Sequence, residues 1–268
     1  MNNIDPTHHP LLTRIATGAQ WIGKDHFPSC IEWADEHERW LRFVDEAGEL
    51  NRYFQRLRGP KERRDEAFAE LAVIFFLAER CGLPPTEWEP VGAGNKRGEV
   101  LVRLPGKGSM FVEVKSPGWE AEIANAEGQG SPRLKMPKYI DGESRAIGPW
   151  KSVREAIAKA CPKVPDSIPT LLVINDDLMV SLTFVQINVD IALYCEKGKG
   201  THKSGYLAEE GSFVGSRYER LGGLGVFQVS LGGNGIEYKF SLCDNPNALK
   251  TTAIPQSIFT GFPRNNKT

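Results

Sequence analysis

The chain has 268 residues, a formal net charge of −1 at pH 7, 40% hydrophobic residues and 25% charged residues. This composition is that of an ordinary globular protein and excludes an intrinsically disordered chain, which has few apolar residues and a high net charge. A chain so close to neutrality has no overall attraction for nucleic acid, so a nucleic-acid partner would need a locally basic surface.

The cysteines and the first residues indicate the cellular compartment. Five cysteines are scattered along the chain without a C-x-x-C pair, which argues against a disulfide framework or a zinc knuckle and favours a reducing compartment. The first residues do not combine a basic start with an apolar core, and no stretch approaches the apolar length of a membrane span. We therefore expect a cytoplasmic protein with no membrane partner.

The first part of the chain is predicted to be mainly helical. Residues 1–30 carry Pro, Gly, His and Asn without clear periodicity, so we expect an irregular or loosely packed lead-in. Residues 30–59 space their apolar side chains as one or two amphipathic helices do. Pro60 suits the first turn of the next helix, which should run until Gly82 and the following Pro-Pro pair.

The period then changes to that of β-strands. Residues 86–91, 98–104 and 109–116 are short segments with β-branched residues and turn residues between them, so they predict a three-stranded antiparallel meander. Residues 117–149 form a long connection rich in Gly, Pro and charged residues. A connection of this length inside a compact domain indicates a function.

The second half of the chain adds a helix and further strands. Residues 149–163 predict a helix, because Trp150, Val153, Ile157 and Ala160 form one apolar stripe. Residues 170–175 suit a central strand that is covered on both faces. Residues 179–194 and a hairpin over residues 225–242 are expected to extend the sheet. The element order therefore predicts an α/β fold with a mixed sheet flanked by helices.

Three acidic residues and one lysine lie at unusual places in these elements. Glu70 is the only polar side chain of residues 67–78, so it should either lie at the rim of the core or meet a cation. Glu99 opens the middle strand, while Glu113 and Lys115 lie two positions apart and share one strand face. Each also has a simpler interpretation: a helix-flank glutamate, a solvated strand-end acid, and an ion pair on an edge strand.

Together the element order and these residues resemble the PD-(D/E)XK nuclease superfamily, the fold of many restriction-type endonucleases. Glu70 would be the acid of the first core helix, Glu99 the first acid of the motif, and Glu113-Val114-Lys115 the E-x-K. The resemblance extends over roughly residues 60–175. It implies a restriction-endonuclease-like domain over residues 59–268 with additional C-terminal strands, and a helical extension over residues 1–58, in one compact unit.

The resemblance also implies a Mg²⁺-dependent endonuclease that hydrolyses phosphodiester bonds of DNA, with Mn²⁺ as a substitute. Glu70, Glu99, Glu113 and the Val114 carbonyl would hold the cation, because hard divalent cations prefer oxygen ligands. Lys115 would orient or deprotonate the attacking water, or neutralise the transition state.

One departure from the family pattern bears on activity. The family usually has Asp at the first acid, often after Pro, whereas this chain has Gly98-Glu99. One alternative is therefore a catalytically inactive nuclease-fold module that binds nucleic acid or a protein partner. Another is a scaffold in which all four residues are surface charges.

A basic stretch precedes and includes the helix predicted at residues 149–163. Residues 131–163 carry eight basic residues against three acidic ones, a local excess of five positive charges. We expect nucleic acid to contact this stretch, most readily DNA, through Lys138, Lys151, Arg154 and Lys159. The simpler interpretation is a solvated helix face on which Glu155 and Lys159 form an i,i+4 pair. The sequence leaves open whether the chain forms a homodimer.

Overall fold

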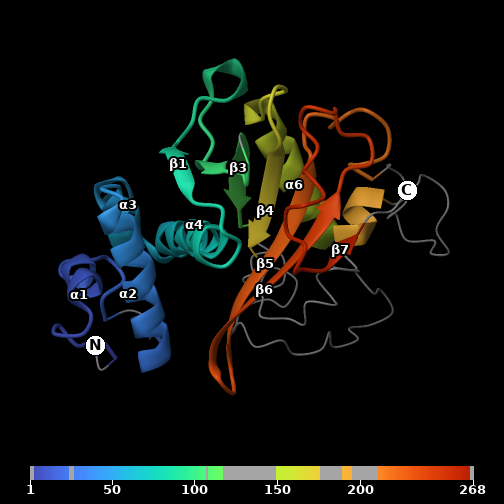
Figure 1. The fold of residues 1–268 in the computed structure, drawn as a ribbon. Coiled ribbons are helices and arrows are strands. Elements are labelled where there is room, and N and C mark those ends of the chain that lie inside the picture. Colours follow the sequence, from blue (N-terminus) through green and yellow to red (C-terminus); the bar gives the residue numbers. More distant parts are fainter. Residues whose placement is uncertain are drawn as a thin grey trace, which may run out of the picture.

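The computed structural model describes residues 3–23, 27–106, 108–116, 149–175, 189–194 and 211–265. Its centre is a seven-stranded sheet in which the strands follow the order β1-β2-β3-β4-β5-β6-β7 (Figure 1). The strands are β1 (Pro85–Trp88), β2 (Val100–Arg103), β3 (Ser109–Lys115), β4 (Thr170–Asn175), β5 (Gly223–Gly232), β6 (Gly235–Asp244) and β7 (Arg264–Asn265).

The sheet is mixed, and its pairing confirms most of the predicted strands. Strands β1, β2 and β3 form the predicted antiparallel meander. Strand β4 is parallel to both β3 and β5, and all six of its residues are buried, as predicted for a central strand. Strands β5 and β6 form the predicted antiparallel hairpin, and β7 adds a short parallel pairing at the far edge.

Helices cover both faces of the sheet. The helices are α1 (Pro10–Ala16), α2 (Ile31–Glu46), α3 (Leu50–Arg58), α4 (Lys61–Glu79) and α6 (Pro149–Ala160), with short 3₁₀ helices η1 (Ala93–Asn95) and η2 (Cys161–Lys163). In β4, Leu171 and Val173 pack into the core that contains α4, whereas Leu172 and Ile174 pack into the core that contains α6. Since alternate residues of a strand face opposite sides, α4 and α6 lie on opposite faces. The α/β class is confirmed.

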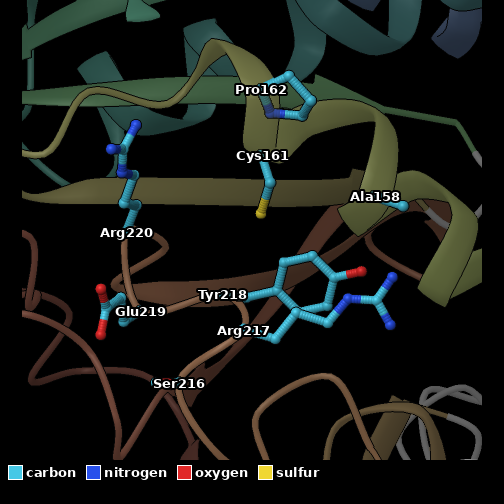
Figure 2. Close-up of a pocket in the computed structure, with 8 residues that line it drawn as sticks. All are labelled: Ala158, Cys161, Pro162, Ser216, Arg217, Tyr218, Glu219 and Arg220. Carbon is cyan, nitrogen blue, oxygen red and sulfur yellow. The ribbon is translucent and has the colours of Figure 1, made fainter.

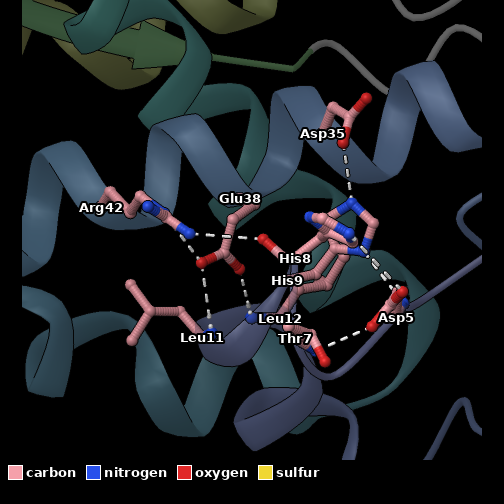
Figure 3. A network of polar contacts seen from close by, with 9 residues as sticks. All are labelled: Asp5, Thr7, His8, His9, Leu11, Leu12, Asp35, Glu38 and Arg42. Carbon is pink, nitrogen blue, oxygen red and sulfur yellow. Dashed lines mark hydrogen bonds and ion pairs between the residues drawn. The ribbon is translucent and has the colours of Figure 1, made fainter.

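The sequence predicts an irregular or loosely packed lead-in, but its described residues are not loosely packed, and they include helix α1, with turns before and after it. Leu12 and Ile15 of this helix are fully buried. The carboxylate of Glu38, on α2, accepts hydrogen bonds from the backbone N–H groups of Leu11 and Leu12 at 3.3 and 2.9 Å (Figure 3). The capping carboxylate of α1 thus comes from a residue more than twenty positions away, and the local signal that remains is Pro10 in the first turn.

The N-terminal segment is also fixed by His9, immediately before α1. Its Nδ1 accepts a hydrogen bond from the backbone N–H of Asp5 at 2.9 Å, so the ring proton is on Nε2, which donates to Asp35 at 2.8 Å (Figure 3). Together with Glu38, this histidine attaches α1 to α2.

A second prediction is wrong in the part that the structure describes. Residues 179–194 were expected to extend the sheet, but residues 189–194 are helical. Val189, Ala192 and Leu193 are buried in the core that contains α6. A short apolar run fits a buried helix turn as well as a strand, because periodicity alone does not separate the two. Residues 179–188 and the predicted long connection up to residue 148 lie outside the described residues.

Among the described helices, none combines the length and the apolar character that crossing a membrane requires.

A buried histidine lies at the contact between α2 and α4. The ring of His37 lies 4.7 Å from that of Phe27, 5.7 Å from Trp33, 5.0 Å from Trp40 and 4.3 Å from Phe68. Burial lowers the pKa of His37 from 6.5 to about 3. The unfolded chain therefore binds a proton at His37 between pH 6.5 and about 3 that the folded chain excludes.

This exclusion predicts a pH-dependent stability. Since the unfolded state binds more protons in that window, the contribution of His37 to the free energy of unfolding is complete above pH 6.5 and is lost as the pH falls, by up to about 1.4 kcal/mol per pH unit. The variant His37→Phe should lack this dependence, whereas His8→Phe, at a position that is 74% exposed, should keep it. Urea unfolding of the three proteins at pH 4.5–7.5 checks this. If the free energy of unfolding changed with pH equally in wild type and His37→Phe, the prediction would be wrong.

Candidate active site

The four residues singled out in the sequence come together at one end of β3. The Nζ atom of Lys115 lies 2.6 Å from Oε1 of Glu113 and 3.8 Å from Oε1 of Glu99. Glu70, on α4, is close enough to raise the pKa of Glu99. Glu113 is 0% exposed and Glu70 is 8% exposed, so the interpretation of all four residues as surface charges is wrong.

The register of β3 explains which way its charged side chains point. Glu113 pairs with Leu172 and Lys115 with Ile174 of the parallel strand β4. These two β4 residues pack towards α6, and register partners share a face of the sheet. Glu113 and Lys115 therefore face the side of the sheet that α6 and the following turn η2 cover.

Glu113 is the most deeply buried carboxylate of the site. Its Oε1 accepts a hydrogen bond from Nζ of Lys163, on η2, at 2.5 Å, and the same oxygen contacts Lys115. Its Oε2 is buried and has no hydrogen-bond partner among the described residues. A buried carboxylate oxygen ordinarily has a partner, so Oε2 is the atom of this site that an additional ligand would satisfy.

Glu70 meets a cation, as its burial in an apolar helix requires. Arg56, on α3, donates from Nη1 to Oε2 and from Nη2 to Oε1, both at 2.6 Å. Burial raises the pKa of the Glu70 carboxyl, and Arg56 opposes this rise. The same interaction raises the pKa of Arg56 further above its ordinary value.

The backbone around Glu99 is fixed by both neighbouring strands. Its N–H donates to the carbonyl of Val112 at 3.2 Å, and its carbonyl accepts from the N–H of Glu89 at 3.0 Å. A Cβ atom at Gly98 would overlap the ring of Phe111. Glycine at position 98 therefore lets the chain cross directly over this ring and places Glu99 beside β3.

A second glycine positions η2. A Cβ atom at Gly92 would overlap the carbonyl oxygen of Lys163. The loop after Gly92 is closed by a hydrogen bond from its N–H to the carbonyl of Lys96 at 2.7 Å. The close approach that this glycine permits brings η2, and with it Lys163, against the meander.

The electrostatics of the site separate two of its groups. Burial raises the pKa of Glu99 to about 7, and the neighbouring carboxylates of Glu70 and Glu113 add to the rise. Burial alone would lower the pKa of Lys115, but the carboxylates of Glu113 and Glu99 outweigh burial and raise it. Lys115 is therefore a cation at neutral pH, whereas Glu99 is divided between its protonated and ionised forms.

The donor set suits a divalent cation in chemical type, although the present arrangement is closed by ion pairs. Within the described part of the chain, no three His, Cys, Asp or Glu side chains are arranged to hold a metal ion. Both oxygens of Glu70 are bonded to Arg56. Hard divalent cations prefer carboxylate oxygens as ligands. The buried Oε2 of Glu113 is such an oxygen, and it has no hydrogen-bond partner among the described residues. Binding of Mg²⁺ or Mn²⁺ by these residues would therefore require the ion pairs to open.

Arg56 and Lys163 are site residues that the sequence analysis did not identify. Arg56 lies in the segment assigned to an N-terminal extension, and Lys163 was only one of eight basic residues of a charged stretch. The lone Glu70 in an apolar helix indicates that a cation is needed, but it does not say which. No local signal identifies either partner, because each ion pair joins separate elements of the fold.

The predicted nucleic-acid contacts stay predictions. Lys138 lies outside the described residues, and Lys151 lies in α6 with a side chain that is not described. Nε of Arg154 donates to the carbonyl of Ala192 at 3.2 Å, so part of this guanidinium binds the protein itself. Lys159 is 73% exposed and lies 3.9 Å from Oε2 of Glu155, the i,i+4 pair expected of a solvated face.

A cavity of about 400 Å³ lies next to η2 and is lined by other residues (Figure 2). Its lining includes Arg217, whose guanidinium lies 5.1 Å from the centre of the Tyr218 ring, and Cys161 of η2. Burial raises the pKa of the Cys161 thiol to about 12, so this thiol stays protonated at neutral pH and is not an activated nucleophile. None of the four predicted site residues lines this cavity.

Comparisons with known proteins do not assign a family. No protein-family model matches the sequence, and no curated protein matches it either. Among solved structures, Pyrococcus furiosus SfsA in complex with Ca²⁺ is similar at 19% identity with a TM-score of 0.28, over 66% of this chain and 62% of that chain. The chain thus spans less than two thirds of the length of that protein, and similarity this low establishes neither a shared fold nor a shared function.

The raised pKa of Glu99 predicts a second pH-dependent stability. Its carboxyl binds a proton in the folded state between pH 4.5 and about 7 that the unfolded state has already released, so its contribution to the free energy of unfolding falls as the pH rises through this window. The free energy of unfolding of Glu99→Gln, taken relative to that of wild type, should rise by about 1–3 kcal/mol between pH 4.5 and pH 8. Glu237→Gln, at a side chain that is 45% exposed, is the matched control. Urea unfolding measures both, and a Glu99→Gln difference independent of pH would contradict the assignment.

The Arg56–Glu70 pair predicts strong energetic coupling. Arg56→Gln leaves a buried carboxylate without its counter-ion and should lower the free energy of unfolding by about 1–3 kcal/mol. The double variant Arg56→Gln/Glu70→Gln should lose less free energy of unfolding than the two single variants lose together. The difference, the coupling energy, should be at least about 1 kcal/mol. The exposed pair Glu237 and Lys239, 4.0 Å apart, should show almost none in the same double-mutant cycle. Additive losses at Arg56 and Glu70 would refute the coupling.

Proposed function

We propose that this chain is a metal-dependent nuclease of PD-(D/E)XK type, an endonuclease that hydrolyses phosphodiester bonds of DNA. The observation that carries the proposal is the burial of Glu113 beside Lys115, with Glu99 and Glu70 in the same electrostatic cluster. Burial of several carboxylates together is costly and is typical of a functional site.

The residues of the chain have distinct tasks in this proposal. The side chain of Lys115 is 25% exposed, and in this proposal its ammonium meets the phosphodiester. It donates hydrogen bonds to the attacking water or to a phosphate oxygen on which negative charge develops. The ion pair with Glu113 holds the ammonium of Lys115 in place, and hydrogen bonds to the two neighbouring strands hold the backbone of Glu99.

Glu99 and Glu113, with the Val114 carbonyl and Glu70, are the groups that would hold Mg²⁺, or Mn²⁺ in its place. When bound, such a cation supplies positive charge at the phosphate and activates water at neutral pH. Glu70 can take part only when its ion pair with Arg56 opens, since Arg56 is bonded to both of its oxygens.

A second candidate function is a catalytically inactive module of the same fold that binds nucleic acid or a protein partner. The observation in its favour is that each carboxylate already has a cation nearby: Arg56 at Glu70, Lys115 near Glu99, and Lys115 and Lys163 at Glu113. When Glu99 is ionised, the three acids and three bases balance without any added ion. Binding without cleavage would then use the basic residues of α6 and the stretch before it.

The test of the proposed function is plasmid cleavage. Purified protein should convert supercoiled plasmid to nicked or linear DNA in the presence of Mg²⁺, and EDTA should abolish the conversion. Glu113→Gln and Lys115→Met should each lower the cleavage rate at least about a hundredfold. Lys115 acts at the phosphate in this proposal, and Glu113 holds Lys115 in place.

The chain offers a matched control, because Glu237-Tyr238-Lys239 repeats the E-x-K spacing on the exposed part of β6. Glu237→Gln and Lys239→Met should cleave at the wild-type rate. Equal cleavage by wild type, Glu113→Gln and Lys115→Met would sink the proposal and indicate a contaminating nuclease. A salt-sensitive gel shift without cleavage would favour the binding module.

A further inference from the structure

The carboxylate of Glu113 receives two lysines on one oxygen and, among the described residues, no hydrogen bond on the other. Nζ of Lys163 lies 2.5 Å from Oε1, and Nζ of Lys115 lies 2.6 Å from the same atom. Oε2 is buried with no hydrogen-bond partner within the described part of the chain. The proposed chemistry requires only one lysine at this carboxylate, so the second needs a separate explanation.

The two lysines are held differently. Lys115 extends from β3 itself and also lies 3.8 Å from Glu99, so it has two carboxylates to interact with. Lys163 comes from η2, which follows α6, and the carbonyl of Lys163 packs directly against Gly92. The backbone of η2 is closed by a hydrogen bond from the N–H of Val164 to the carbonyl of Cys161 at 3.2 Å. Lys163 therefore extends from a fixed turn and reaches across to Glu113.

The deep burial of Glu113 makes the number of its cations important. An ionised carboxylate that is 0% exposed needs a cation in contact at all times, because an unpaired buried charge costs several kcal/mol. If Lys115 were the only counter-ion of Glu113, a movement of Lys115 to a water or a phosphate would leave the buried carboxylate unpaired, at that energetic cost. With Lys163 on the same oxygen, Glu113 stays neutralised when Lys115 turns to the substrate.

We infer that Lys163 is a positioning residue of the proposed nuclease site. It holds Oε1 of Glu113 so that Oε2 keeps one fixed direction, and it keeps Glu113 neutralised while Lys115 serves the reaction. The inference rests on the proposed function, and it assigns to Lys163 a task that differs from that of a phosphate contact or of a simple positive charge.

A cation-binding measurement without DNA separates these tasks. If Lys163 acted only as a charge, Lys163→Met would remove repulsion and strengthen the binding of Mn²⁺. If Lys163 positions Glu113, the same change should weaken Mn²⁺ binding by about 10–100-fold, the usual effect of losing a group that orients a ligand. Lys163→Arg keeps a donor and a charge, so its affinity should stay within about threefold of wild type. Isothermal titration calorimetry with MnCl₂ gives these values, with Lys239→Met as the matched control.

Cleavage kinetics provide the second readout. Lys163→Met should lower kcat at least about tenfold with KM for DNA within about threefold, and Lys163→Arg should recover most of the rate. An increased KM with unchanged kcat would make Lys163 a DNA contact and overturn the inference. Mn²⁺ affinity that is unchanged or higher in Lys163→Met would overturn it as well.

The design separates failure of the inference from failure of the proposed function. If wild type neither binds Mn²⁺ nor cleaves DNA, both are overturned. If wild type does both and Lys163→Met behaves like Lys239→Met, only the role of Lys163 is lost. Circular dichroism checks that the variants fold. Should Lys163→Met not fold, a folded Lys163→Arg that loses Mn²⁺ binding would decide against the inference.

Discussion

The site depends on one energetically costly feature, an ionisable carboxylate at a fully buried position of β3. Glu113 cannot be solvated there, so the fold must bring cations to it. One of them, Lys115, is supplied two residues away by the same strand. The other, Lys163, requires the chain to cross from β3 through the connection and α6 and to return at η2. The close packing of Gly92 against η2 helps to place Lys163 there.

The same logic draws the N-terminal helices into the site. Glu70 lies among apolar residues of α4, and the cation that satisfies it is Arg56 of α3. Helix α3 is fixed in turn by Tyr53, which is 2% exposed and packs beside Trp88 of β1. The segment that the sequence presents as an extension thus supplies one of three cations that balance three carboxylates. Loss of this segment would remove the counter-ion of Glu70.

Much of the sheet could be predicted because its signals are local. The β-branched alternation of β2 and β3, the apolar run of β4 and the Gly-rich hairpin turn between β5 and β6 each lie within about ten residues. Glu113 and Lys115 could be paired from sequence because a strand has a period of two. Arg56 and Lys163 could not, since they lie 14 and 50 positions from their carboxylates. The capping carboxylate of helix α1 is also distant, because it belongs to α2, although Pro10 in the first turn of α1 is a local signal.

The Gly98-Glu99 sequence has a steric explanation in the ring of Phe111. Glycine at position 98 has no Cβ to meet the Phe111 ring, so the backbone can pass directly over this ring. Glu99 is the least tightly paired of the three carboxylates, with Lys115 at 3.8 Å compared with 2.6 Å at Glu113. It is therefore the carboxylate that can change partners at the lowest cost, while Glu113 and Glu70 stay held by the cations that their burial demands.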